Sequence, residues 1–348
     1  MKELRTLYWH NDSLFLIDQK TLPQKLRYVK CRSYLDVARA ITNMTVRGAP
    51  AIGVAAAYGL ALAAKAAARK NKNEIINGLR RAAEVLGKTR PTAVNLYWAI
   101  NRVMRVAEEA WMKNDDVAKV VLDEAEKIAR EDVEINRRIG KNGAGLLPDK
   151  GVVMTYCNAG ALATAGYGTA LGVIKSAVEM GKKISVIVPE TRPKLQGARL
   201  TAYELEVAGI EYRVISDNMA AFIMSRGMID CVVVGADRIL ARTGHVTNKI
   251  GTLGLAISAN FYKIPFYVAA PLSTIDFERT PDEIVIEERS QDEVLYFAGK
   301  RITPRRARAI NYAFDITPPE LVTRIITEEG IHSPNELMLL KTNCHFKQ

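Results

Sequence analysis

The hydrophobic positions of the chain follow two different patterns on the two sides of residue 142. On the N-terminal side they recur mainly at helical spacing, which predicts helices with one buried face. Two short apolar runs around Thr21-Leu22-Pro23 indicate a β-hairpin. We therefore expect residues 1–142 to form a small, mostly helical N-terminal domain with a short β-hairpin. The expected strands are 14–18 and 25–29, and the expected helices are 33–46, 50–65, 73–86, 93–110 and 115–139.

After Gly151 short β-branched runs alternate with helical stretches. This alternation is typical of a parallel sheet covered by helices. We therefore expect residues 143–348 to form an α/β domain that carries the chemistry. The expected strands are 152–156, 184–188, 212–215, 231–234 and 266–268, with 284–286 as a candidate sixth. The expected helices are 162–180, 197–208, 220–225, 251–262 and 318–329.

Charge adds a question about the partner, because the 348 residues carry a formal net charge of +11. Lys and Arg alternate with Glu and Asp along most of the chain, which is typical of a solvated surface. The densest basic cluster, Arg301 to Arg308, lacks the interleaved aromatic side chains of nucleic-acid binders. We therefore expect a phosphate-bearing small molecule as the partner, and no nucleic acid.

The sequence offers little to suggest a membrane, a metal or a cofactor. Residues 1–20 lack the apolar core of a signal peptide, and the most apolar run, 49–64, is too short to span a bilayer. The four cysteines show no C-x-x-C pair and no metal-site spacing. Gly166, Gly168 and Gly172 fall inside the expected helix 162–180, so the context of a dinucleotide motif is not met. We expect a cytoplasmic protein with reduced thiols, no metal and no cofactor.

Reactive side chains follow two of the expected parallel strands. Cys157 comes directly after one strand, and Asp237 follows Cys231 to Val234 and the small pair Gly235-Ala236. Because the carboxyl ends of parallel strands share one edge of a sheet, we expect both side chains at one ligand site. An apolar strand behind Asp237 favours a raised pKa and a role as proton donor. A helix start after Cys157 favours a lowered pKa for its thiol.

Each of these two residues also has a purely structural interpretation. Asp237 has the alternative of capping the next turn or pairing with Arg238. Cys157 has the alternative of being a small buried core residue, which is the commoner fate of cysteine. The position of Cys157 at a strand end favours the functional interpretation.

Several polar residues precede expected helix starts. Arg47-Gly48-Ala49 lead into Pro50, and Arg90 stands before the helix 93–110. A helix N-terminus with free N–H groups and a nearby guanidinium is suited to phosphate. Gln196 and the pair Asn248-Lys249 likewise stand before helices, where we expect them to bind hydroxyl and phosphate groups. The alternatives are surface positions for Arg47 and Gln196 and ordinary capping by Asn248.

Seven blocks together resemble the methylthioribose-1-phosphate isomerases, which share a family with archaeal ribose-1,5-bisphosphate isomerases and the regulatory subunits of initiation factor 2B. The resemblance covers nearly the whole chain and implies a helical N-terminal domain on a Rossmann-like C-terminal domain. The blocks are RGAPAIGVAAAYGLAL (47–62), TRPTAVNLYWAI (89–100), TYCNAGALATAGYGTALGV (155–173), ETRPKLQGARLTAYEL (190–205), SDNMAA (216–221), GADRI (235–239) and NKIGT (248–252).

The resemblance also implies roles for individual residues. Cys157 matches the cysteine that stabilises the transition state or relays a proton, and Asp237 matches the proton donor. The implied substrate-binding residues are Arg47, Gly48, Ala49, Arg90, Gln196, Asn248 and Lys249. The chain departs from the family's usual pattern at Asn311-Tyr312, where the family has Asn-Pro.

The implied activity is conversion of the aldose 5-methylthioribose 1-phosphate to the ketose 5-methylthioribulose 1-phosphate, in methionine salvage, by a homodimer without cofactors. One alternative is isomerisation of ribose 1,5-bisphosphate, and another is a non-catalytic regulatory subunit of the initiation factor 2B type. Met44, Tyr97 and Trp98 favour the thioether substrate if they line the site.

Overall fold

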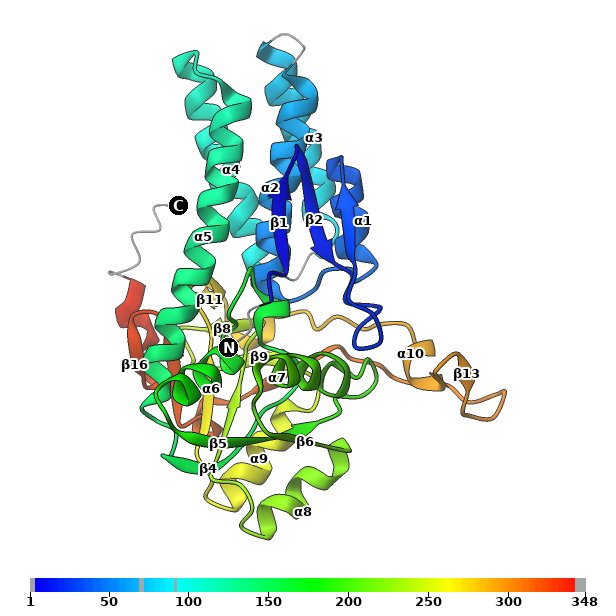
Figure 1. Cartoon of the computed structure of the whole chain (residues 1–348), viewed down its shortest axis with the longest axis vertical. Coiled ribbons are helices and arrows are strands. Elements are labelled where there is room, and N and C mark those ends of the chain that lie inside the picture. The colour runs from blue at the N-terminus through cyan, green and yellow to red at the C-terminus, as the bar shows by residue number, and fades with distance from the viewer. Residues whose placement is uncertain (1–3, 69–71, 91–92, 342–348) are drawn as a thin grey trace.

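The computed structural model describes residues 4–68, 72–90 and 93–341. In this part of the chain a tall bundle of helices stands on an α/β domain, as Figure 1 shows. The N-terminal part contains a three-stranded antiparallel sheet, in the order β1-β2-β3, and five helices. Their bounds are β1 Leu7–His10, β2 Ser13–Ile17, β3 Tyr28–Cys31, α1 Tyr34–Thr42, α2 Ala49–Ala67, α3 Lys72–Gly87, α4 Val94–Lys113 and α5 Val117–Ala144.

The expected hairpin and helices are confirmed with small shifts. The hairpin is β2–β3, and the sequence pattern missed β1, which pairs with the other edge of β2. Helix α1 begins after Ser33, whose side chain accepts from the backbone of Asp36 while the Asp36 carboxylate accepts from the Ser33 N–H. This capping box satisfies donors that a helix start otherwise leaves free.

Helix α2 is the centre of the bundle, because α1, α3, α4 and α5 all pack against it. It is apolar on every side, as a fully buried helix is. Among the described residues it is the one helix long and apolar enough to cross a membrane, with 83% of its apolar window buried inside the protein. Our expectation that this run is too short was therefore wrong, because the helix extends to Ala67.

The C-terminal part is built on a seven-stranded sheet in the order β16-β15-β10-β7-β4-β5-β6. All neighbours are parallel except β16, which pairs antiparallel with β15. This confirms the expected α/β class. The strands are β4 Lys150–Met154, β5 Lys183–Pro189, β6 Tyr212–Ile215, β7 Cys231–Val234, β10 Phe266–Ala269, β15 Arg324–Thr327 and β16 Gly330–His332.

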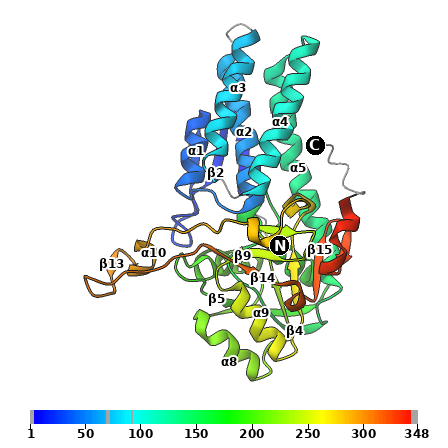
Figure 2. The same ribbon diagram turned by 180° about the vertical axis from the view of Figure 1, so that it is seen from behind.

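Helices cover both faces of this sheet. The C-terminal end of α5 and helices α6 Ala170–Glu179 and α7 Ala202–Ala208 bury apolar residues against one face. Helices α8 Ala220–Ser225 and α9 Thr252–Phe261 cover the other face. Figure 2 shows these two helices in the view of the molecule from behind. Because α5 runs to Ala144, the boundary that we expected after residue 142 falls within its last turn, and the division into two domains stays a prediction.

Three expected elements were wrong. Residues 318–329 form no helix, because Pro318 and Pro319 begin only the short turn η6 Pro319–Leu321 and the β-branched residues after it form β15. Residues 284–286 form no strand. Helix α6 begins only at Ala170, so Gly166 and Gly168 lie in the loop before it rather than inside a helix. That loop folds back on itself through the pairing of Gly160 with Gly168.

A second sheet lies beside the first and was not anticipated. Its order is β11-β8-β9-β14, with β8 Arg238–Leu240, β9 Val246–Lys249, β11 Ile275–Asp276 and β14 Phe314–Thr317. Its strands have two to four residues, too short to give a recognisable pattern. Asn248 and Lys249 therefore end a strand, where Phe314 pairs with Lys249, and the helix that we expected after them begins at Thr252.

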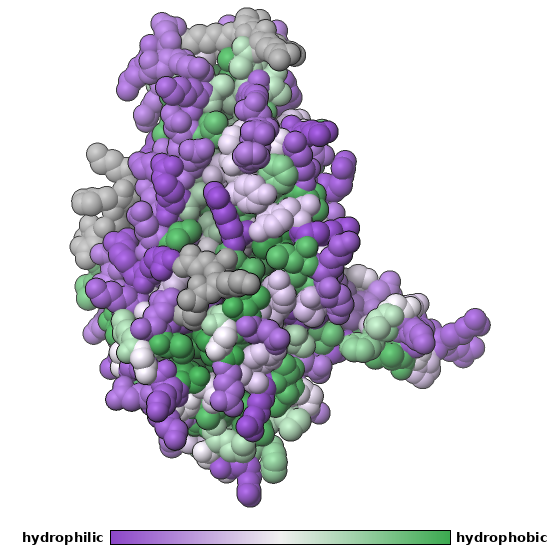
Figure 3. All heavy atoms as spheres, viewed as in Figure 1, coloured by the Kyte–Doolittle hydropathy of each residue, from purple (hydrophilic) through white to green (hydrophobic). Residues whose placement is uncertain are grey.

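Residues 290–310 form an arm that projects from the body of the molecule, as Figure 3 shows. It contains α10 Asp292–Leu295, β12 Tyr296–Phe297 and β13 Lys300–Arg301. The Arg301 guanidinium donates to the carbonyl oxygens of Pro304, Arg305 and Ala307, at 3.1 Å each. At least one arginine of the basic cluster at 301–308 thus stabilises the fold of the arm through hydrogen bonds within it. The two ends of the arm return to the body at Arg289 and at β14.

The packing of α2 gives a prediction for stability. A methyl group at Gly53 of α2 would lie 2.7 Å from the carbonyl oxygen of Asn95 in α4. We expect Gly53→Ala to lower the free energy of unfolding by about 1–3 kcal/mol, because the two helices would have to separate. A Cβ added at Gly78 of α3 would have its nearest neighbour 3.6 Å away. Gly78→Ala should therefore raise the free energy of unfolding by about 0.5–1 kcal/mol through helix propensity alone. Urea unfolding measures both, and equal effects would contradict this packing.

Candidate active site

One cavity lies where the carboxyl ends of β4 and β7 face the N-terminus of α2. All nine residues singled out in the sequence line it, although they come from both halves of the chain. They are Arg47, Gly48, Ala49, Arg90, Cys157, Gln196, Asp237, Asn248 and Lys249. Their meeting at one cavity is a structural fact, and their individual roles stay predictions.

Cys157 is held in a constrained backbone conformation at the end of the segment that follows β4. Its φ is +58°, which only a few non-glycine residues adopt. Its N–H donates to Thr191 Oγ1 at 3.0 Å, and its carbonyl accepts from Thr201 Oγ1 at 2.6 Å. The side chain is 8% exposed and faces the cavity. Hydrogen bonds on both sides of the residue thus fix the direction of the thiol.

The pKa of the Cys157 thiol is raised, so the expected lowering was wrong. Burial disfavours the thiolate and outweighs the opposing charges of Arg47 and Lys249. The helix start that we expected to lower it is also absent, because a bent loop follows Cys157 and the next element is the single turn η1 Ala161–Ala163. The thiol is therefore protonated at neutral pH.

Asp237 follows β7 and is a buried acid, as expected. Its N–H donates to the carbonyl of Thr247 at 2.9 Å, which joins the end of β7 to the second sheet. Burial raises the pKa of its carboxyl group, against the charges of Lys249, Arg90 and Arg47. The alternative pairing of Asp237 with Arg238 is not found among the described residues, and Arg238 donates to Asp276 at 2.8 Å. Asp237 is thus suited to donate a proton.

The N-terminus of α2 opens into the cavity. Gly48 is its cap residue, with φ +97°, and a Cβ there would lie 2.5 Å from Ala163 Cα. Only glycine therefore fits the approach to this helix. Its first turn carries no acidic residue, and Arg47 stands next to it. Free N–H groups, the helix dipole and a guanidinium together make an anion site.

Basic groups dominate the described part of the lining. Arg47, Arg90, Lys249 and Arg289 face the cavity with Asp237 as the carboxylate among them. The Lys249 ammonium donates to the Ala313 carbonyl at 2.8 Å and lies 4.7 Å from the centre of the Phe314 ring. Burial lowers its pKa, although Cys157 and Asp237 oppose this. Such a lining suits an anion. Arg90 pairs with Glu287 at 3.7 Å and Arg289 with Glu293 at 2.9 Å, so Arg47 and Lys249 are the cations that gain most from one.

Two amide side chains add neutral polar groups. Gln196 stands before the π-helix η2 Gly197–Thr201, and its Oε1 is buried without a hydrogen-bond partner. A buried acceptor without a partner is costly, so a ligand hydroxyl there would be favourable. Asn248 Nδ2 donates to Thr252 Oγ1 at 3.0 Å, which leaves its Oδ1 for other contacts. This pattern is typical of sugar recognition.

The sequence did not identify Arg289, and two of the three residues considered for a thioether do not line the cavity. Arg289 lies in an irregular stretch before the arm, where nothing in the sequence marks it. Of the three residues proposed for a thioether, Met44 lines the cavity. Tyr97 instead donates to the Gly87 carbonyl, and Trp98 borders a separate small cavity. Among the described residues no group of three or more His, Cys, Asp or Glu is placed to hold a metal ion.

Comparison with known proteins places this arrangement in a family. The family described as "Initiation factor 2 subunit family" matches residues 45–334. A protein of Methanocaldococcus jannaschii described as "Putative methylthioribose-1-phosphate isomerase" is 53% identical over 344 residues, which is 98% of this chain and 98% of that protein.

Two solved structures are similar over almost the whole chain. The 5-methylthioribose 1-phosphate isomerase of Pyrococcus horikoshii OT3 has a TM-score of 0.89 and 46% identity, with 97% of this chain and 95% of that chain covered. A protein of A. fulgidus described as translation initiation factor eIF-2B, subunit delta, has a TM-score of 0.85 and 47% identity, with 97% and 98% covered. The chain therefore belongs to the initiation factor 2 subunit family and, within it, to the methylthioribose-1-phosphate isomerases.

Proposed function

We propose that the protein converts 5-methylthioribose 1-phosphate to 5-methylthioribulose 1-phosphate, as the names of its relatives suggest. The observation that carries the proposal is that Cys157 and Asp237 share one cavity with four cationic side chains, while burial raises the pKa of both groups. A phosphate is held by the cations, and the neutral acid and thiol face the sugar. The place of this reaction in methionine salvage belongs to the same proposal.

The chemistry needs an acid, because phosphate on the anomeric oxygen prevents the ring from opening as in a free sugar. Asp237 gives its proton to the ring oxygen, and the bond from that oxygen to C1 breaks. Hydrogen then moves from C2 to C1, and the C2 hydroxyl loses its proton as C2 becomes a carbonyl. That lost proton balances the one that Asp237 gave.

The protonation state of Cys157 bears on the route of the hydrogen. An enediol route needs a base, and burial keeps the Cys157 thiol protonated. A hydride shift needs no base to take a proton from carbon, because the carboxylate left on Asp237 takes the proton of the C2 hydroxyl. A neutral, apolar wall stabilises this shift by excluding water. Pro271 and Phe314 contribute to this wall. We therefore favour the hydride shift, with Cys157 beside the moving hydrogen.

A second cavity favours the thioether over a second phosphate. It continues from the first through Gly48, Ala49, Arg90, Asp237 and Phe314. The residues it adds are mainly apolar: Ile52, Ala93, Ile284, Val285 and Ile286. Its two further cations have acidic neighbours, since Arg238 pairs with Asp276 and Arg279 borders the cavity together with Glu283. A methylthio group fits such a lining better than a phosphate dianion does.

The similarity to the A. fulgidus protein, described as an eIF-2B subunit, supports the alternative of a regulatory subunit of the initiation factor 2B type. A regulatory pocket needs the groups that bind phosphate, but it needs neither an acid nor a thiol for catalysis. Co-purification with initiation factor 2, together with no turnover of the sugar phosphate, would favour this alternative.

We further propose that the enzyme is a cytoplasmic homodimer. Apolar side chains are exposed together on α8 and α9, which contact each other. Phe222, Ile257 and Phe261 are 62%, 52% and 74% exposed. Such a patch is typical of an interface between subunits.

Replacing the proposed acid tests the mechanism. Asp237→Asn keeps the shape of the side chain but has no proton to give, so we expect kcat to fall at least about 10³-fold with KM within about threefold of the original. Steady-state kinetics with purified protein measures both. Turnover near the original rate would exclude Asp237 as the acid.

Isotope transfer tests the hydride route. With substrate that carries deuterium at C2, we expect the product to keep that deuterium at C1 in ordinary water, because a hydride never exchanges with solvent. Mass spectrometry and NMR of the product measure the retention. Loss of most of the label to water would contradict the hydride shift.

Substrate choice tests the second cavity. We expect kcat/KM for 5-methylthioribose 1-phosphate to exceed that for ribose 1,5-bisphosphate at least about 100-fold, because the second phosphate would lose its water against apolar side chains. A larger kcat/KM for the bisphosphate would reverse the assignment of substrate.

A further inference from the structure

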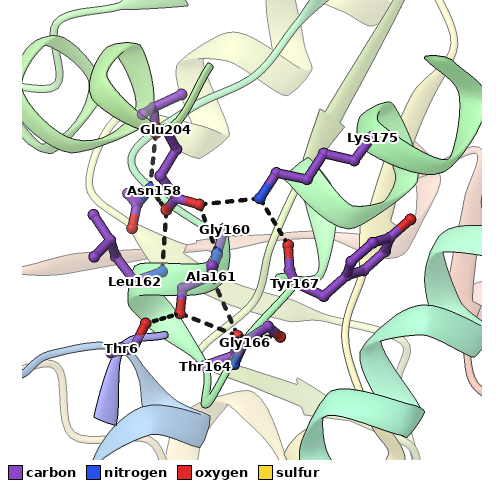
Figure 4. Close-up of polar contacts among 12 residues, drawn as sticks. Thr6, Asn158, Gly160, Ala161, Leu162, Thr164, Gly166, Tyr167, Lys175 and Glu204 are labelled. Carbon is purple, nitrogen blue, oxygen red and sulfur yellow. Dashed lines mark hydrogen bonds and ion pairs between the residues drawn. The ribbon is translucent and has the colours of Figure 1, made fainter. Parts of the chain in front are cut away.

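A buried carboxylate lies directly behind the wall of the cavity and does not line it. Glu204 of α7 is 1% exposed, and Figure 4 shows it pointing into the loop that carries Asn158. Its two oxygens accept from four donors. These are Asn158 Nδ2 at 2.9 Å, Ala161 N at 2.7 Å, Leu162 N at 3.1 Å and Lys175 Nζ at 3.3 Å.

The loop is closed tightly around this group. A Cβ at Gly160 would collide with the carboxylate of Glu204. Lys175 also donates to the Tyr167 carbonyl at 3.1 Å, so it ties the loop to α6 from behind. A buried charge is tolerated only when its hydrogen bonds are complete, and these contacts complete them. The position of the carboxylate is therefore strictly defined.

Glu204 decides which way the Asn158 amide faces. The NH₂ group of Asn158 points to Glu204 and to Thr201, so its Oδ1 points to the opposite side. There Arg47 Nη2 donates to Oδ1, and both terminal nitrogens of Arg47 donate to the Asn158 carbonyl, at 3.3 and 3.2 Å. Asn158 thus holds the guanidinium that faces the cavity.

The same residue adjoins the thiol. Asn158 follows Cys157 directly in the chain, and its backbone N–H acts to lower the pKa of that thiol. One loop residue therefore connects the buried carboxylate to the phosphate-binding Arg47 and to Cys157. Glu204 and Lys175 were not among the candidates from the sequence, since nothing there shows that the two helices meet behind the loop.

We propose that Glu204, paired with Lys175, is a positioning residue that orients Asn158 so that Arg47 binds phosphate and the Cys157 thiol faces the cavity. For its effect on turnover, this rests on the proposed function. Its effects on anion binding and on the thiol do not depend on any particular reaction.

A carboxylate is needed because all its contacts are donors. In Glu204→Gln one oxygen becomes an NH₂ group, which faces either the Asn158 amide, a backbone N–H or the Lys175 ammonium. Turning the Asn158 amide over relieves that conflict, but it places an NH₂ group against the Arg47 guanidinium. Arg47 then loses its hold and moves from the cavity.

The test uses Glu204→Gln in a background where Cys31, Cys231 and Cys344 are alanine, so that Cys157 is the remaining thiol. We expect affinity for inorganic phosphate, measured by calorimetry, to fall at least about tenfold, and KM to rise more than kcat falls. Arg47, Lys249 and Asp237 are the charges that act on the thiol, and Arg47 favours the thiolate. Its movement should therefore shift the pH midpoint of iodoacetamide alkylation upward.

Two further variants separate positioning from stability. Asp132→Asn removes another buried carboxylate, which accepts from Ala165 N at the far end of the same loop and from Asn136 Nδ2 within α5. It should destabilise the protein and leave phosphate affinity and the alkylation midpoint unchanged. The double variant Glu204→Gln/Asn158→Asp restores an acceptor toward both Arg47 and residue 204, and should recover at least about threefold in phosphate affinity.

The proposal is overturned if Glu204→Gln lowers stability but keeps the phosphate affinity and alkylation midpoint of the parent. If this variant does not fold, Glu204→Asp is measured instead, with smaller changes expected in the same direction and no change counting against the proposal. Absence of sugar-phosphate turnover in the parent protein would remove the proposed function alone, because the phosphate and alkylation measurements need no turnover.

Discussion

The structure depends on the cost of removing charge from water. Burial pushes Asp237 toward its neutral acid and Cys157 toward its neutral thiol. The same burial disfavours the charge on Lys249, so the cationic lining gains most when an anion enters. A phosphate and a neutral sugar ring match these two demands. One physical effect therefore prepares both the binding and the acid chemistry.

Backbone geometry places these groups. Cys157 adopts positive φ, and Gly48 provides a helix cap that no larger residue fits. Gly235 allows equally close packing, because a Cβ there would lie 2.7 Å from Ala159 Cβ. Hydrogen bonds with Thr191 and Thr201 hold the Cys157 backbone in this conformation, and Glu204 accepts from the Asn158 side chain and from Ala161 N behind it. The site is thus built on a rigid support that the ligand does not touch.

The sequence predicted the parts that follow from strand ends and helix starts. Cys157 and Asp237 were found because parallel strands align their carboxyl ends, and Arg47 because a Gly-Ala-Pro run opens a helix. The pKa of Cys157 was predicted in the wrong direction, since burial depends on side chains from distant elements. Arg289 and Glu204 were missed for the same reason. The strands of the second sheet are too short to show an alternating pattern. Arg324 to Thr327 were predicted as part of a helix because the sequence does not show that they pair with β10.

Binding of phosphate at the N-terminus of α2, with Asp237 and Cys157 facing the sugar, is central to the proposed chemistry. A crystal structure of the Asp237→Asn variant with 5-methylthioribose 1-phosphate tests it most directly. We expect the phosphate on Arg47 and the first turn of α2, the ring oxygen within hydrogen-bond distance of residue 237, and the C1–C2 bond beside the Cys157 sulfur. A sugar phosphate bound elsewhere, or bound here with its ring turned away from both residues, would contradict this arrangement.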